Sequence, residues 1–200
     1  SSRTRHTTSD RDWSSAVCSS ELATEPTWVG NNTNLPNRVV KLGLEARIFP
    51  ELSDYKEIKP EVVYGRNKKS RIDFLLSGSE ANLPVYVEVK NTTWSQGRLA
   101  VFPDTVTTRG QKHLQELISI LPTGRAVMLY FINRGDCDSF APGDQVDPVY
   151  GKMLREAVAQ GVEVLVYRFE TKPQGIRYLG KANFIASMPE LSVNSTNSYR

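Results

Sequence analysis

The sequence predicts an α/β fold in which a mixed β-sheet carries helices on both faces. Three observations predict it: three consecutive β-branched and aromatic runs separated by turn residues, two later apolar runs that each follow an amphipathic helix, and one amphipathic helix ahead of them all. Three strands in a meander followed by two crossover units give a sheet that is antiparallel on one side and parallel on the other.

The elements follow from the spacing of apolar residues and from the turn residues between them. Pro50 stops the first helix, Gly65 and Gly78 separate the first three strands, and Gly161 ends the last helix. In chain order, the sequence predicts a helix over residues 36–49, strands over 58–64, 71–76 and 85–90, a loop over 92–107, a helix over 109–121, a strand over 125–132, a helix over 148–160 and a strand over 162–169.

Charge and hydropathy narrow the class of protein. The chain has 200 residues with 25 Lys and Arg against 22 Asp and Glu, and a net charge of +3 is too small to prove a nucleic-acid partner. No stretch approaches the ~18 consecutive apolar residues of a membrane helix, so no membrane partner is expected. Cys18 and Cys137 stand far apart and without paired histidines, which predicts neither a disulfide framework nor a zinc site. The expected compartment is a bacterial cytoplasm, with a plastid as the alternative.

The composition predicts three segments. Residues 1–27 are expected to be disordered or artefactual, because they are rich in Ser, Thr, Arg and Asp, and residues 11–22 read like a translated sequencing adapter. Residues 28–187 form the expected α/β domain, and residues 188–200 a flexible polar tail. Candidate functional residues are therefore sought in the middle segment alone.

The residues that carry chemistry lie on two neighbouring predicted strands. Glu88 and Lys90 are two apart, so they share one face of a strand whose other face carries valines. A hairpin would bring Asp73 beside Glu88, and two converging carboxylates favour a divalent cation as their neutraliser. Asp73 and Glu88 are thus candidate ligands of a divalent cation, and Lys90 could orient or deprotonate a water or stabilise charge on a phosphate.

The alternative is purely structural. An Asp followed by a later Glu-x-Lys occurs by chance in many chains, and a cross-strand salt bridge between Asp73 and Lys90 would explain both residues without any catalysis. The order of the surrounding elements weighs against this alternative, since the acid lies on the second strand and Glu-x-Lys on the third, with a helix before the strands and another after them. That arrangement resembles the core of the PD-(D/E)XK (restriction-endonuclease-like) nuclease superfamily, whose motif maps here to Asp73, Glu88 and Lys90.

A closer resemblance covers the chain from about Trp28 to about Tyr167 and indicates the sugar fermentation stimulation protein A (SfsA) family. It implies a DNA-binding protein, linked to the regulation of sugar utilisation, with an OB-like domain ahead of the nuclease-like one; most of that OB-like half is missing from this sequence. The most specific block is residues 102–114. The matching segments, in order, are residues 36–40, 64–65, 70–74, 87–91, 102–114 and 150–166.

Basic and polar residues around this motif form the predicted DNA-binding set. They fall into a loop between the first two strands, the first helix, and the first turns of the helix after the loop, where backbone N–H groups and the helix dipole favour a phosphate. A solvated surface is the alternative for each. The set is Arg38, Arg66, Lys68, Lys69, Arg71, Arg109, Gln111 and Lys112.

For three further groups of polar residues, a structural role is the expectation. His113 is expected to be a partly buried helix residue rather than a ligand, since no second histidine is near it in the sequence. Glu45 is expected to pair with Lys41 at helical spacing, with a role as a further acid as the alternative. The aspartates after the fourth strand are expected to form an acidic surface loop, because their spacing lacks the pattern of a calcium loop. They are Asp136, Asp138, Asp144 and Asp147.

Three functions remain open at this point. The first is a DNA-binding protein of the SfsA type with a Mg²⁺-dependent phosphodiesterase site. The second is a regulator that binds DNA without cleaving it, and the absence of a recognisable helix-turn-helix counts against strong sequence specificity. The third is an interaction domain in which the Asp/Glu/Lys cluster is structural. The sequence does not distinguish DNA from RNA and does not predict the oligomeric state.

Overall fold

The structure is a computed structural model that describes residues 27–30, 32–65, 70–78 and 83–186. Its helices are α1 (Leu35–Glu45), the short 3₁₀ helix η1 (Pro50–Leu52), α2 (Thr108–Ile120) and α3 (Pro148–Gln160). Its strands are β1 (Glu57–Tyr64), β2 (Ser70–Ser77), β3 (Val85–Thr92), β4 (Ser95–Gln96), β5 (Leu99–Phe102), β6 (Arg125–Ile132), β7 (Ser139–Pro142), β8 (Glu163–Lys172), β9 (Gly175–Lys181) and β10 (Asn183–Phe184).

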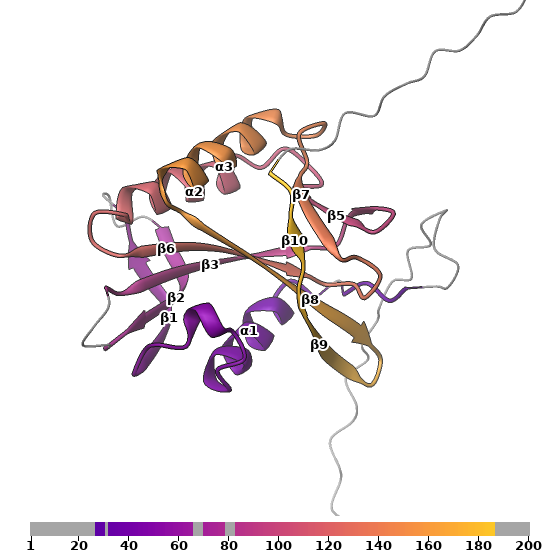
Figure 1. Cartoon of the computed structure of the whole chain (residues 1–200), viewed down its shortest axis with the longest axis horizontal. Helices are drawn as coiled ribbons and strands as arrows, with labels where there is room; N and C mark the ends of the chain where they lie inside the picture. The colour runs from indigo at the N-terminus through magenta and orange to yellow at the C-terminus, as the bar shows by residue number, and fades with distance from the viewer. Residues whose placement is uncertain (1–26, 31, 66–69, 79–82, 187–200) are drawn as a thin grey trace, which may run out of the picture.

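The large sheet confirms the predicted mixed α/β class. Its six strands run in the order β1-β2-β3-β6-β8-β9. The pairs β1–β2 and β2–β3 are antiparallel, β3–β6 and β6–β8 are parallel, and β9 closes the far edge antiparallel to β8. Figure 1 shows α1 on one face of this sheet and α2 with α3 on the other. The three-strand meander and the two crossovers are therefore present as predicted.

Strand β6 shows why helices are needed on both faces. Met128 and Tyr130 pack into the core on the side of α2 and α3, whereas Val127, Leu129 and Phe131 pack into the core on the side of α1. All five are 0% exposed, because side chains alternate along a strand and both faces of this one are covered. The near-continuous apolar run of residues 125–132 is thus a central strand buried on both sides.

The first helix is shorter than predicted. The apolar spacing extends to residue 49, but α1 ends at Glu45 and the chain reverses at Arg47, whose φ is 53°. The Arg47 guanidinium donates to the backbone oxygens of Ser53 and Tyr55, which fixes this left-handed residue in place. The exposed ion pair between Lys41 and Glu45, 3.7 Å apart, is confirmed.

The predicted loop over residues 92–107 is wrong as far as residue 102. It contains the end of β3 and the short strands β4 and β5, which belong to a second, four-stranded sheet in the order β10-β7-β5-β4. Each strand of this sheet is two to four residues long, too short for a period-two pattern to stand out in the sequence. The sheet packs Ala100 and Phe140 into the core beneath α2 and α3.

The predicted acidic surface loop is also corrected. Asp136 and Asp138 pair with arginines, and Asp144 pairs with Arg155 on α3. Asp147 is not a surface residue: it is 1% exposed and is the N-cap of α3. It accepts hydrogen bonds from the backbone N–H of Tyr150 and of Thr107, both at 2.9 Å, and so joins the starts of α2 and α3.

Loss of this carboxylate is expected to be costly. Replacing Asp147 by Ala removes the N-cap of α3 and leaves the Thr107 and Tyr150 N–H groups without their acceptor, so we expect a loss of about 2–4 kcal/mol in the free energy of unfolding. Urea denaturation followed by circular dichroism measures it. The exposed Asp104→Ala variant, on the same approach to α2, should change the free energy by less than about 0.5 kcal/mol. Equal effects of the two variants would contradict the assigned role.

Candidate functional site

Strand β3 presents the two predicted motif residues on the face toward α2. Val85, Val87 and Val89 belong to the core on the side of α1, which leaves Glu88 and Lys90 on the opposite face. Glu88 is 3% exposed and the Lys90 side chain 12%, so both are held largely out of water. The predicted division of β3 into a valine face and a polar face is confirmed.

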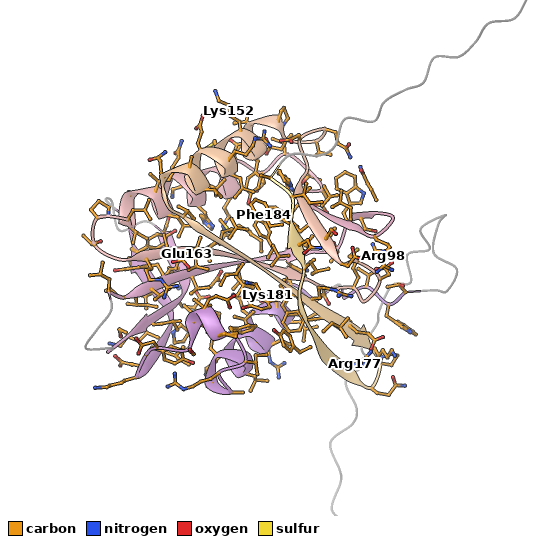
Figure 2. The ribbon with its side chains drawn as sticks, viewed as in Figure 1. Arg98, Lys152, Glu163, Arg177, Lys181 and Phe184 are labelled. Carbon is orange, nitrogen blue, oxygen red and sulfur yellow. The ribbon has the colours of Figure 1, made fainter. Side chains whose placement is uncertain are left out.

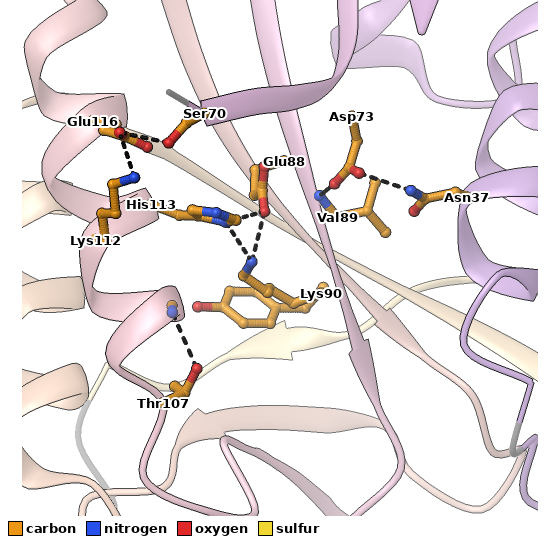
Figure 3. Close-up of polar contacts among 12 residues, drawn as sticks. Asn37, Ser70, Asp73, Glu88, Val89, Lys90, Thr107, Lys112, His113 and Glu116 are labelled. Carbon is orange, nitrogen blue, oxygen red and sulfur yellow. Dashed lines mark hydrogen bonds and ion pairs between the residues drawn. The ribbon is translucent and has the colours of Figure 1, made fainter. Parts of the chain in front are cut away.

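The first acid lies on the neighbouring strand. Strands β2 and β3 pair with Phe74 opposite Val87, and Asp73 and Glu88 are the residues next to this end of the paired stretch. The Asp73 carboxylate accepts hydrogen bonds from the Val89 N–H and from the Asn37 side-chain amide of α1, each at 2.7 Å. Figure 3 shows Asp73 and Glu88 on either side of β3's backbone at Val89.

A bend in β1 accompanies this arrangement. Glu61 has a φ of 55°, which is left-handed and rare for a non-glycine residue. Glu61 lies opposite Asp73 in the β1–β2 register, between the pairs Pro60–Phe74 and Val62–Ile72. Ile72 packs toward α2 and α3 and Phe74 toward α1, although residues two apart in a regular strand share a face. The irregular stretch around Asp73 is therefore where β2 changes its buried face.

Glu88 is bound on one oxygen only. The Lys90 ammonium donates to Glu88 Oε1 at 2.6 Å, and His113 Nδ1 of α2 contacts the same oxygen. Lys90 Nζ also lies 3.0 Å from His113 Nδ1. Burial by itself would raise the pKa of Glu88, but the hydrogen bond from His113 and the charge of Lys90 bring that pKa below its ordinary value. The other oxygen, Oε2, is buried and has no hydrogen-bond partner among the described residues.

Asp73 behaves in the opposite way. Burial and the negative charge of Glu88 raise the pKa of Asp73 to about 6, in spite of the hydrogen bonds from Val89 and Asn37. The two carboxylates thus have opposite pKa shifts, upward for Asp73 and downward for Glu88. The Asp73–Lys90 salt bridge of the structural alternative is not the ion pair that Lys90 forms, because Lys90 pairs with Glu88.

The two acids open into a cleft of about 470 Å³. Of the predicted DNA-binding residues, Arg71, Arg109 and Lys112 line it. The full lining is Glu61, Ser70, Arg71, Asp73, Glu88, Arg109, Lys112 and His113. The cleft therefore combines carboxylates on the sheet with cationic side chains from β2 and from the first turns of α2.

The other described residues of the predicted DNA-binding set, Arg38 and Gln111, do not line the cleft. Arg38 is exposed on α1, one residue after Asn37, which binds Asp73. The Gln111 amide donates to both carboxylate oxygens of Asp147, at 3.1 and 3.0 Å, and is thereby tied to the start of α3. The remaining three, Arg66, Lys68 and Lys69, lie outside the described residues.

Helix α2 supplies site residues that sequence reasoning missed. His113 is 5% exposed and lines the cleft, and Glu116 accepts from the Ser70 hydroxyl at 2.6 Å while lying 3.5 Å from Lys112. The signal in the sequence was the position of His113 in the buried stripe that also contains Leu117 and Ile120. A polar residue in an apolar stripe needs a buried polar partner, and here that partner is Glu88.

The donor set fits a divalent cation that keeps some of its water. Among the described residues, no three His, Cys, Asp or Glu side chains form a group that could hold a metal ion. Mg²⁺, however, is commonly bound through one or two carboxylates, with waters and substrate phosphate completing its shell. Asp73 and Glu88 supply two carboxylates, and the unpartnered Oε2 of Glu88 is a buried anionic atom that a cation would satisfy.

Curated relatives and one solved structure resemble this chain. Proteins called sugar fermentation stimulation protein homolog are 68% identical in Nostoc punctiforme, over 79% of this chain and 66% of the relative, and 63% identical in Synechocystis, over 80% and 67%. The chain thus spans about two thirds of the length of these relatives. The structure of Pyrococcus furiosus SfsA in complex with Ca²⁺ superposes with a TM-score of 0.73 at 27% identity, over 80% of this chain and 68% of that one.

The fold and the family agree. The mixed sheet with its flanking helices is the nuclease-like fold of the SfsA neighbour. No helix among the described residues is long and apolar enough to cross a membrane. A family model described as the sugar fermentation stimulation protein RE domain matches residues 34–175, which include every described element of the cleft. The chain therefore belongs to the sugar fermentation stimulation protein family, SfsA.

Proposed function

We propose that this chain is a DNA-binding protein whose cleft is a site for cation-dependent hydrolysis of a phosphodiester. One observation carries the proposal: Asp73 and Glu88 share a single cleft with Arg71, Arg109 and Lys112. Carboxylates that attract a divalent cation and side chains that attract phosphate are the two components that such a reaction requires.

Asp73 and Glu88 are the residues that would hold the cation, for which we propose Mg²⁺. The Pyrococcus furiosus SfsA structure is a complex with Ca²⁺, and Ca²⁺, like Mg²⁺, prefers oxygen ligands. When bound, such an ion supplies Lewis-acid polarisation of a phosphate and lowers the pKa of a water molecule. Because the pKa of Asp73 is raised and that of Glu88 is lowered, Asp73 is the acid whose charged form is less stable while no cation is bound.

The protein's own cationic side chains have distinct tasks. Lys90 donates to Glu88 Oε1 and so fixes the carboxylate while it places a positive charge beside the two acids. Arg109 and Lys112 stand in the first turns of α2, where the helix dipole adds to their charge, and we assign them to the DNA backbone. Contacts of this kind give affinity that is independent of sequence and falls with salt.

A second candidate is a regulator of sugar utilisation that binds DNA without cleaving it. Two observations favour it: Glu88 Oε1 is already held by both Lys90 and His113, and the described residues supply only a pair of carboxylates rather than a group of three metal-binding side chains. A third candidate, an interaction domain, is favoured by the buried Lys90–Glu88 pair, because such a pair can serve structure alone. For each candidate we propose the bacterial cytoplasm as the compartment, since the curated relatives are cyanobacterial.

The three candidates separate in one experiment. Supercoiled plasmid and linear duplex are incubated with the full chain and Mg²⁺ or Mn²⁺, with Ca²⁺ and EDTA as parallel conditions, and gel shifts are recorded at several salt concentrations. Cleavage that requires the cation supports the hydrolytic site. Salt-sensitive shifts without cleavage favour the regulator. If no cleavage occurs and neither DNA nor RNA is shifted at low salt, the first two candidates are rejected and the interaction domain remains.

The rim of the cleft gives a quantitative prediction for DNA affinity. Arg109→Gln and Lys112→Gln should each lower the slope of log affinity against log salt by about 1 and weaken binding several-fold at low salt. Lys152→Gln is the matched control: its side chain is 76% exposed, points outward from α3 (Figure 2) and does not line the cleft. A salt slope that changes equally in all three variants would contradict the assignment of the cleft as the DNA-binding surface.

A further inference from the structure

We propose that His113 is a positioning residue that orients Glu88 toward the cation. The inference rests on the proposed cation site and adds to it a residue on a different element. Three features carry it: the contact between His113 Nδ1 and Glu88 Oε1, the burial of both side chains, and the unpartnered state of Glu88 Oε2 among the described residues. Figure 3 shows the imidazole approaching Glu88 from α2 on the side away from Asp73.

The hydrogen-bond roles follow from the chemistry of the partners. An ionised carboxylate only accepts, so the short contact with Glu88 Oε1 is attractive when His113 carries a proton on Nδ1. If Nδ1 instead accepted from Lys90, its lone pair would face the lone pairs of Oε1 at close range. Lys90 donates to Oε1 at 2.6 Å, so the imidazole and the ammonium both converge on this one oxygen. We therefore assign to His113 Nδ1 the proton that is shared with Glu88 Oε1.

This arrangement decides which oxygen remains for a cation. Two donors hold Oε1, one from the strand that carries Glu88 and one from α2, and together they fix the rotation of the carboxylate group. The ammonium alone sits on a flexible four-carbon chain, whereas the imidazole is a rigid ring with a side chain 6% exposed. Oε2 is left buried without a partner from the described part of the chain, which is costly unless a cation coordinates it.

The alternative is that His113 only fills space between α2 and β3. Under that alternative, any side chain of similar size that preserves packing would leave cation affinity unchanged. Under the positioning role, the N–H donor matters: Asn can offer its amide nitrogen near the place of Nδ1, whereas Leu fills the space without a donor. Hydrogen-bond partners of metal ligands are typically worth about 10–100-fold in metal affinity.

The test is calorimetric titration of the full chain with Ca²⁺, in wild type, His113→Asn, His113→Leu and the exposed same-helix control Gln115→Leu. We expect His113→Leu to weaken Ca²⁺ binding about 10–100-fold and His113→Asn to stay within about threefold of wild type. Gln115→Leu should bind as wild type does.

Two outcomes overturn the inference alone: a folded His113→Leu variant that binds Ca²⁺ as tightly as wild type, or ¹⁵N shifts of the wild-type His113 ring that show Nδ1 without its proton. The ¹⁵N measurement decides by itself if the leucine variant does not fold. A wild type that binds no Ca²⁺, with or without DNA, overturns both this inference and the hydrolytic function. The two failures are therefore distinguishable.

Discussion

Asp73→Asn is expected to abolish cation-dependent cleavage and, at the same time, to raise the thermal stability of the cation-free protein near neutral pH. The loss of a charged ligand should reduce the rate of cleavage at least ~100-fold, since a bound cation contributes several kcal/mol to such reactions. The gain in stability has a separate cause: in the absence of a cation, the folded protein holds the Asp73 carboxylate half-buried and within the field of the charged Glu88.

The direction of the pH dependence follows from the raised pKa. Folding raises the pKa of Asp73 from 3.8 to about 6, so in this range the folded state binds more protons than the unfolded state. The stabilising contribution of the neutral acid is complete below pH 4 and is lost as the pH rises through about 6. At pH 7.5 the charged acid then costs on the order of 2 kcal/mol, and Asn, which carries no charge, avoids this cost.

Thermal melts in EDTA at two pH values measure this effect. At pH 7.5 the Tm of Asp73→Asn should exceed that of wild type by several degrees, at roughly 2–4 °C per kcal/mol for a domain of this size. Near pH 4 the difference should shrink. Saturating Ca²⁺ should reverse it, because only the wild type gains free energy from binding. A variant that is less stable than wild type at pH 7.5 in EDTA would contradict the repulsion between the two acids.

Glu88→Ala is expected to be the most destabilising of the changes considered, at about 3–5 kcal/mol in the free energy of unfolding. The reason is the group left behind: Lys90 would keep a largely buried positive charge whose ion-pair partner, among the described residues, is Glu88. The double variant Glu88→Leu/Lys90→Met should lose less free energy of unfolding than Glu88→Leu alone, because the charge is then removed together with its partner.

Urea denaturation in EDTA checks this expectation, with Glu163→Ala as the matched control. Glu163 also lies on a strand of the large sheet and pairs with Arg125 at 2.8 Å, but their side chains are 36% and 33% exposed (Figure 2). Exposed ion pairs contribute about 0.2–1 kcal/mol, and this half-exposed pair should lie near the upper end of that range. If Glu88→Ala costs no more free energy of unfolding than Glu163→Ala, the buried Lys90–Glu88 pair does not stabilise the protein. A functional role would then be the remaining explanation for this pair.

Part of the fold could be predicted because its information is local. The alternation of residues 85–90 determines which side chains of β3 face each way, and the continuous apolar run of 125–132 predicts a strand covered on both sides. The start of α2 is also local: Thr107, a residue type that N-caps favour, accepts from the Gly110 N–H at 3.0 Å. The second sheet was missed because strands such as β5 are stabilised by partners distant in sequence.

The sequence by itself determined the class of the fold, the resemblance to the SfsA family, and the placement of Asp73, Glu88 and Lys90 on adjacent strands. Only the tertiary structure decided that Lys90 pairs with Glu88 rather than with Asp73, and that His113 of α2 contacts the same carboxylate oxygen. The physical reason is that a strand pattern specifies the face of a side chain, whereas its partner is chosen by the packing of a helix that begins many residues later. Burial then sets the pKa values of the two acids, and burial is a property of the assembled molecule.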